Sequence, residues 1–257
     1  MRYVAVGDSF TEGVGDELPD GSVRGWADLV AAGLAVARGD AVRYANLAVS
    51  GRLLEPIVTD QLEAALSLTP APTVLTFNGG GNDMLRPRAD VARLVALTGR
   101  AVRRCADAGV RLVLLSGPDP SDRLPFGRAV HRRAEALTAG VAELAATHRI
   151  TLVDVFHDAE VRRPAYWSPD RLHLNTAGHQ RVASLVLHAL GEDAAAHAVR
   201  SDSPETRRLL TELRYHRQHV LPWVGRRLRG RSSGDGRTGK YTDWTPVPPH
   251  APQTSAT

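Results

Sequence analysis

Short apolar runs alternate with longer amphipathic stretches along roughly the first 190 residues. Five runs, at 3–6, 42–47, 73–77, 111–115 and 151–155, are rich in valine and leucine. Strands buried on both faces of a sheet have this composition. Helical periodicity predicts helices near 26–37, 56–66, 89–108, 128–147 and 176–190, and Gly109 stands where a glycine ends a helix. This alternation indicates a mostly parallel sheet covered by helices on both faces.

The composition changes after residue 190. The segment Ser-Pro-Glu at 203–205 predicts a helix start, and an apolar stripe at helical spacing continues to residue 224. From residue 225 glycine, serine, arginine and proline dominate, a composition that buries too little apolar surface to order itself. We therefore expect a globular domain at 1–192, a helical extension packed on it at 193–224, and a disordered, basic, Pro/Gly-rich tail at 225–257.

Positive charge is concentrated in that tail. Residues 225–240 carry six cations, including Lys240, the only lysine, against Asp235. That segment is +5, which leaves −1 for the rest of a chain with a formal charge of +4. The tail could contact nucleic acid or an anionic membrane, or it could simply be solvated.

The single cysteine, Cys105, excludes an intramolecular disulfide and fits a reducing compartment. Its helical, apolar surroundings favour a packed core thiol. We find no signal peptide and no apolar run long enough to cross a bilayer, so we expect a soluble cytoplasmic protein without a transmembrane segment.

Candidate chemistry begins with Gly7, Asp8 and Ser9, directly after the first expected strand. Ligands bind at the carboxyl ends of strands in an open parallel sheet. An isolated triplet of this kind is more often an ordinary capped turn. A serine nucleophile needs a base, and His173 lies just before the last expected helix, with Asp170 three residues earlier to orient its imidazole.

Acyl transfer also needs donors for a developing oxyanion. Gly51 follows the second expected strand, and its backbone N–H is available there. Asn82 follows the glycine run 79–81 after the third strand, and its amide can donate. The alternative for this glycine run is a flexible phosphate-binding loop or a plain loop, although it lacks the spacing of a P-loop or a dinucleotide fingerprint.

Together these four segments, at 7–9, 51, 80–83 and 170–173, resemble the four blocks of the SGNH/GDSL hydrolases, in the family's order and over about residues 1–190. The resemblance implies a three-layer α/β/α sandwich with a flavodoxin-like, parallel five-stranded sheet. It implies Ser9 as nucleophile, His173 as base and Asp170 as its orienting group. It also implies an oxyanion hole made by the Ser9 and Gly51 N–H groups and the Asn82 amide, with no metal or organic cofactor.

The resulting hypothesis is a serine hydrolase that cleaves carboxylic esters through an acyl-enzyme. A small acyl ester, a sugar ester, a lysophospholipid and a thioester all remain open as substrates. Trp167 could wall an acyl pocket or pack in the core, and Arg52 and Arg86 could meet an anionic substrate or solvent. The alternative function is a vestigial SGNH-fold binding protein whose basic tail contacts nucleic acid or an anionic membrane.

Overall fold

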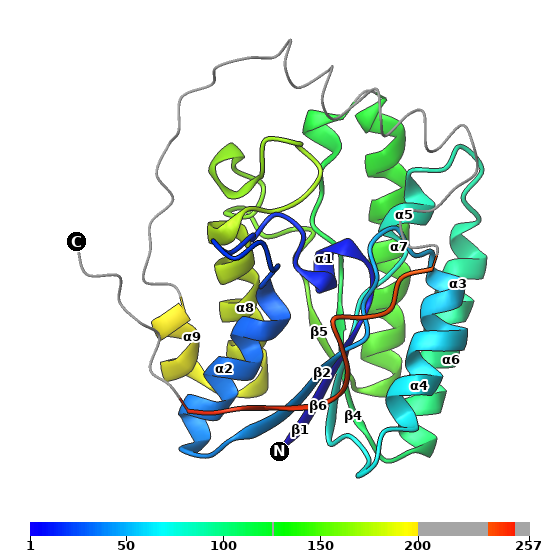
Figure 1. The fold of residues 1–257 in the computed structure, drawn as a ribbon. Helices are drawn as coiled ribbons and strands as arrows, with labels where there is room; N and C mark the ends of the chain where they lie inside the picture. Colours follow the sequence, from blue (N-terminus) through cyan, green and yellow to red (C-terminus); the bar gives the residue numbers. More distant parts are fainter. Residues whose placement is uncertain (125, 200–235, 250–257) are drawn as a thin grey trace.

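The computed structural model of the chain describes residues 1–124, 126–199 and 236–249 (Figure 1). Within these residues one sheet has the strand order β5-β4-β3-β1-β2-β6. The strands are β1 Arg2–Val6, β2 Val42–Asn46, β3 Val74–Phe77, β4 Arg111–Leu115, β5 Thr151–Val153 and β6 Tyr241–Val247. β1 to β5 pair in parallel, whereas β6 runs antiparallel to β2. The five expected strands and the α/β class are confirmed.

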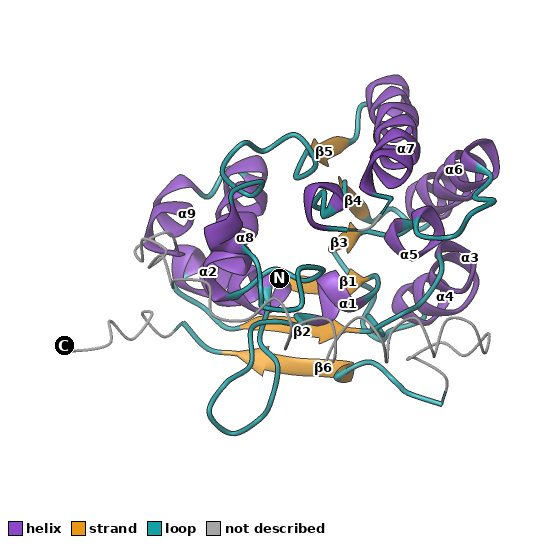
Figure 2. Ribbon diagram, turned by 90° about the horizontal axis from the view of Figure 1, so that it is seen from above, coloured by secondary structure: helices purple, strands orange, loops and turns teal. Residues whose placement is uncertain are grey.

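Helices cover both faces of the sheet, which confirms the three-layer sandwich (Figure 2). One layer contains α2 Trp26–Arg38, α8 Thr176–Leu190 and α9 Asp193–Val199, and the other contains α4 Leu62–Leu66, α6 Val91–Asp107 and α7 Gly127–His148. Three short helices, α1 Ser9–Glu12, α3 Leu54–Pro56 and α5 Gly81–Met84, follow strand ends. A π-helical turn, Ile57–Gln61, joins α3 to α4, so the expected helix at 56–66 is interrupted.

The central strand shows how the sequence builds two cores. In β1, Tyr3 and Ala5 join the cluster under α2 and α8, while Val4 and Val6 join the cluster under α4, α6 and α7. All four side chains are completely buried, because alternate residues of a strand point to opposite faces. A strand covered on both sides therefore has no polar alternation, which is the pattern that the sequence displays.

Helix ends match the local sequence. The Asp90 side chain accepts the Arg93 N–H at the start of α6, and Gly109 follows the end of α6 with a φ of +65°. Asn175 accepts the Gly178 N–H at the start of α8. These caps satisfy backbone groups that a helix end leaves without partners.

The strand β6 departs from the sequence analysis, which assigned residues 225–257 to a disordered tail. For residues 236–249 that expectation is wrong. Val247 pairs with Val42, and the Trp244 indole N–H donates to the Pro70 carbonyl over 3.0 Å. The parallel sheet of five strands thus gains an antiparallel sixth strand. Residues 200–235, which include the expected helix after Ser203, lie outside the described residues, whereas α9 packs Ala195 and Ala196 into the core beside α2 and α8.

Membrane-spanning helices were sought in the part of the chain that the structure describes. None of its helices is both long and apolar enough to cross a membrane.

The contact between α2 and α8 gives a test of this packing. A Cβ atom added at Gly33 would lie 2.6 Å from a methyl group of Leu187, a completely buried side chain. We expect Gly33→Val to lower the free energy of unfolding by about 1–3 kcal/mol through overpacking. Ala37→Val, on the exposed side of the same helix, should cost only about 0.6 kcal/mol through helix propensity. Urea unfolding measures both, and equal losses would contradict the packing described here.

Candidate active site

The turn after β1 presents Ser9 at the carboxyl edge of the sheet. Asp8 caps the short helix α1, and its side chain accepts the Phe10 N–H over 3.1 Å. Gly13 ends α1 with a φ of +106°, and a Cβ there would lie 2.1 Å from the Arg24 carbonyl oxygen. Only glycine allows this reversal, so the turn that carries Ser9 is fixed at both ends.

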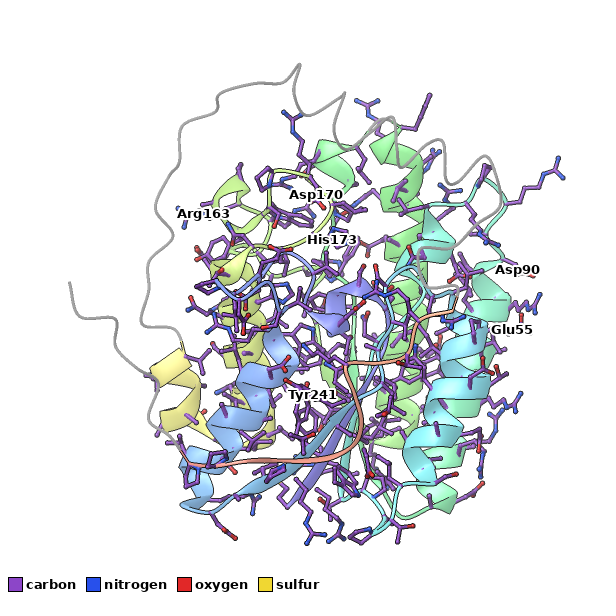
Figure 3. The ribbon with its side chains drawn as sticks, in the orientation of Figure 1. Glu55, Asp90, Arg163, Asp170, His173 and Tyr241 are labelled. Carbon is purple, nitrogen blue, oxygen red and sulfur yellow. The ribbon has the colours of Figure 1, made fainter. Side chains whose placement is uncertain are left out.

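A chain of two hydrogen bonds joins Ser9 to the loop before α8. Ser9 Oγ lies 3.0 Å from His173 Nε2, and His173 Nδ1 lies 2.5 Å from Asp170 Oδ2. Figure 3 shows Asp170 and His173 side by side near the end of the sheet where α1 lies. Burial acts to raise the pKa of Asp170, but hydrogen bonds from His173 and Leu172 outweigh it and hold that pKa below its ordinary value. An ionised Asp170 only accepts, so Nδ1 carries a proton and Nε2 faces the serine hydroxyl.

Hydrogen bonds within the loop that carries His173 fix its conformation. Asp170 Oδ1 accepts the N–H groups of Leu172 and His173, both over 3.0 Å. Ser168 donates its N–H to the His173 carbonyl over 2.9 Å. Arg171 takes a φ of +60°, a conformation that non-glycine residues rarely adopt. Such strain persists where the surroundings impose it, and functional loops are a frequent setting.

The other two residues expected at the site lie on the same edge. The Asn82 amide donates from Nδ2 to Asp8 Oδ2 over 3.0 Å and to the Arg52 carbonyl over 3.1 Å. Gly51 has a φ of +78°, in the turn after β2. The structure therefore brings Ser9, Gly51, Asn82 and His173 to the wall of one cleft.

This cleft has a volume of about 800 Å³, and its wall combines polar and apolar side chains. The apolar side chains come from α7, α5 and the loops after β3, β4 and β5: Met84, Leu85, Pro87, Pro118, Pro120, Val130, Ala134, Leu137 and Phe156. A concave apolar surface with a few convergent polar groups is the usual form of a small-molecule site.

The structure shows where the residues lie whose role the sequence alone does not decide. Trp167 is buried among core side chains and does not line the cleft, and its indole N–H donates to the Val161 carbonyl over 2.7 Å. Arg52 and Arg86 both line the cleft. Cys105 is buried in the core beneath α6, and burial raises the pKa of its thiol to about 12, which makes it a poor nucleophile at neutral pH.

Two further polar side chains bind backbone N–H groups at the site, and no sequence pattern predicts them. Gln61, at the end of the π-helical turn, accepts the Gly7 N–H over 2.8 Å. Glu12, buried at the end of α1, accepts the Ser50 N–H over 2.6 Å. Neither stands in a recognisable motif, because each contact depends on how distant segments pack. In contrast, Val130, Ala134 and Leu137 follow helical spacing, a signal that could have predicted the cleft wall.

The buried groups near Ser9 have altered acidities. Burial raises the pKa of Asp8 to about 6, against hydrogen bonds from Phe10 and Asn82. Burial also lowers the pKa of His179 to about 4; its ring lies between the Trp26 N–H and the Val14 carbonyl. His179 thus serves as a neutral packing group. Within residues 1–124, 126–199 and 236–249, no group of three or more His, Cys, Asp or Glu side chains could hold a metal ion.

Solved structures with the same fold are hydrolases. The lipase Lip_vut3 from a goat rumen metagenome matches with a TM-score of 0.61 and 19% identity, over 74% of this chain and 97% of that one. LAE5, an α/β hydrolase enzyme from the Lake Arreo metagenome, matches with a TM-score of 0.61 and 24% identity, over 75% and 95%. Axe2 from Geobacillus, an acetyl-xylooligosaccharide esterase studied as a mutant, matches with a TM-score of 0.57 and 18% identity, over 74% and 94%.

No curated protein matches the sequence. A family model does match it, over residues 5–181, which contain the end of β1, all of β2 to β5 and every residue of the cleft wall named above. The chain is therefore a hydrolase that belongs to the GDSL-like lipase/acylhydrolase family.

Proposed function

We propose that this hydrolase cleaves carboxylic esters through an acyl-enzyme formed on Ser9. The observation that carries the proposal is the series of hydrogen bonds from Ser9 Oγ to His173 Nε2 and from His173 Nδ1 to Asp170 Oδ2. This series ends in a cleft of about 800 Å³ with an apolar wall. Nucleophile, base and orienting group in hydrogen-bond contact are the requirement for activating a serine hydroxyl.

In the first half-reaction, Ser9 Oγ attacks the ester carbonyl carbon while its proton passes to His173 Nε2. The carbonyl π electrons move to oxygen and form a tetrahedral oxyanion. Collapse of this intermediate breaks the bond to the leaving oxygen, which takes the proton from His173. Water then enters, loses a proton to His173 Nε2 and cleaves the acyl-Ser9 ester in the same way, which restores the serine and releases the acid.

The oxyanion is proposed to meet the N–H groups of Ser9 and Gly51 and the amide of Asn82. Asn82 Nδ2 donates to Asp8 Oδ2 and to the Arg52 carbonyl, which uses both of its N–H groups. The oxyanion is therefore proposed to replace one of these acceptors, and the bond that remains holds the plane of the amide. Donors that are oriented in advance stabilise a developing charge without reorganising during the reaction. In this proposal Asp8 acts through Asn82, and the chemistry needs no metal or organic cofactor.

The cleft wall favours a substrate with an acyl chain. Most of the side chains beyond Ser9 are apolar, and they form a surface that a sugar or an acetyl group would leave largely uncovered. Arg52 and Arg86 on the same wall could meet an anionic part of the substrate. We therefore propose an acyl ester whose chain has several carbons, and we propose a cytoplasmic location, which the lone buried thiol of Cys105 fits.

The alternative, a binding protein whose basic tail contacts nucleic acid or an anionic membrane, depends on residues 225–257. Two of the six cations expected there, Arg237 and Lys240, form ion pairs within the fold. The other four lie outside the described residues. No contact in the described structure favours this alternative over the hydrolase.

Replacement of the nucleophile tests the proposal directly. We expect Ser9→Ala to lower kcat on a chromogenic ester by at least about 10³-fold, because no other group can carry the acyl chain. The melting temperature of the variant should equal that of the wild type, since other residues hold the turn that carries Ser9. Mass spectrometry of the wild type during turnover should find the acyl group on Ser9. Full activity in Ser9→Ala, or acylation elsewhere, would refute the assignment.

The apolar wall predicts a dependence on chain length. Each added methylene that enters the cleft should raise kcat/KM about fourfold, since burying one is worth about 0.8 kcal/mol. Ala134→Trp should fill the cleft from α7 and remove this gain for long chains while sparing an acetate ester. Ala136→Trp, on the exposed side of the same helix, is the matched control. A wild type that prefers acetate would show that the apolar wall does not bind the acyl chain.

Asp8 predicts a pH dependence of stability. Its pKa is raised by burial to about 6 from an ordinary 3.8. Between these two pKa values the folded state therefore holds a proton that the unfolded state releases. The contribution of Asp8 to the free energy of unfolding is fully present below the unfolded pKa and is lost as the pH rises through the folded pKa. Asp8→Asn removes the charge. The free energy of unfolding of this variant minus that of the wild type should therefore be about 2–3 kcal/mol larger at about pH 8 than at about pH 4.5.

Urea unfolding at the two pH values measures this difference. Asp107→Asn, at an exposed residue in the last turn of α6, should give the same stability change at both. If Asp8→Asn behaves like Asp107→Asn, then Asp8 is not a buried anion at neutral pH.

A further inference from the structure

The chain's only lysine is partly buried beside α1, the helix that begins with Ser9. Lys240 Nζ lies 2.6 Å from the Glu12 carbonyl oxygen, 3.1 Å from that of Val23 and 2.6 Å from Asp28 Oδ2, and it also contacts the Arg24 carbonyl. Its side chain is only 14% exposed. A single ammonium group thus joins the end of α1 to the loop before α2 and to α2 itself.

The chemistry of this contact suits lysine alone. An ammonium group is compact and donates in three directions, whereas a guanidinium donates in one plane from a rigid fork. Carbonyls from α1 and from the 23–24 loop converge on Lys240 Nζ together with a carboxylate. Without Lys240 the largely covered Asp28 carboxylate would lose its cation, a costly arrangement.

A second cation of the same segment reaches the Gly51 loop through Glu12. Arg237 Nη2 lies 2.5 Å from Glu12 Oε1, and Glu12 Oε2 accepts the Ser50 N–H over 2.6 Å. Ser50 directly precedes Gly51, a proposed oxyanion donor. Glu12 is also the last residue of the four-residue helix that begins with Ser9. Both cations therefore act on the elements that carry the nucleophile and the oxyanion hole.

The backbone of this segment is closely fitted to the sheet. A Cβ atom added at Gly239 would lie 2.5 Å from both the Asn46 carbonyl oxygen and the Leu47 Cα atom, at the end of β2. Tyr241, which starts β6, packs edge-on against Tyr44 with ring centres 5.8 Å apart. The segment is thus anchored on both sides of Lys240, and it lies beyond residues 5–181, to which the family match is confined.

We propose that Lys240 and Arg237 are positioning residues, and that the hydrolase unit of residues 5–181 is catalytically incomplete without the C-terminal segment 236–241. The inference rests on the proposed function, because it assigns these cations a role in holding Ser9 and Gly51. Lys240 fixes the end of α1, and Arg237 fixes Glu12 and through it the turn before Gly51. Neither cation touches the substrate.

The test uses the full-length protein and the chromogenic ester on which the wild type is most active in the chain-length series. Lys240→Met and Arg237→Gln should each lower kcat by about tenfold to a hundredfold, with KM within about twofold, because displaced catalytic groups weaken transition-state binding most. Lys240→Arg should not restore the rate, since its planar fork cannot meet the converging carbonyls. Thr242→Ala, two residues along on exposed backbone of β6, is the matched control and should match the wild type.

Measuring kcat well below each variant's melting temperature distinguishes a loss of catalytic rate from a mere loss of stability. Variants that melt earlier but keep kcat within twofold of Thr242→Ala would overturn the inference. If Lys240→Met does not fold, Arg237→Gln decides, because the Arg237 side chain is 51% exposed and its loss should spare the fold. An inactive wild type would refute the proposed function itself, whereas an active wild type with unaffected variants would refute only this inference.

A spectroscopic readout follows from the single lysine. Isotopic labelling of lysine nitrogen should give one side-chain ammonium signal in an NMR spectrum, and it should be protected from solvent exchange. Modification of Ser9 by a fluorophosphonate should shift this signal, since Lys240 Nζ donates to the last residue of the helix that Ser9 begins. A signal that does not move would show that the two groups are not coupled.

Discussion

The contact between Ser9 Oγ and His173 Nε2 joins residues 164 positions apart, and the geometry of the site depends on it. Neither residue can make this contact from its own segment. Ser9 needs the sheet to aim the turn after β1, and His173 needs its loop to be held against that turn. The two segments contact each other closely at Gly15 and Leu174. A Cβ atom at Gly15 would lie 1.9 Å from the Leu174 carbonyl oxygen, so only glycine allows this contact.

Beneath Ser9, buried and partly buried carboxylates hold neighbouring segments together. Asp16 binds Arg24 and the Gly25 N–H, Glu12 binds the Ser50 N–H, and Asp28 binds Lys240. A buried charge is costly without a partner, so each carboxylate selects one arrangement of the segments around it. The same constraint supports the proposed role of the C-terminal segment, which is remote in sequence: it supplies the cations that pair with Glu12 and Asp28.

The sequence predicted the elements whose pattern is local. Five buried strands, the major helices and the four motif segments were all visible, because burial on both faces and strand-end motifs leave a direct trace in the residue order. Strand β6 left no such trace. Residues 236–249 contain two glycines and three prolines, which are typical of a loop, and Tyr241–Val247 forms a strand because it pairs with the edge of β2. The contacts of Lys240 and Gln61 depend on packing between distant segments, which no local pattern reports.

The central claim is that His173 activates Ser9, and the pH dependence of Ser9 modification tests it most directly. The rate at which a fluorophosphonate labels Ser9 should fall as acid protonates His173, because a protonated ring cannot accept the serine proton. In His173→Ala the rate should be low and should lose this acid limb. A wild-type rate that is independent of pH, together with unchanged labelling in His173→Ala, would contradict the account.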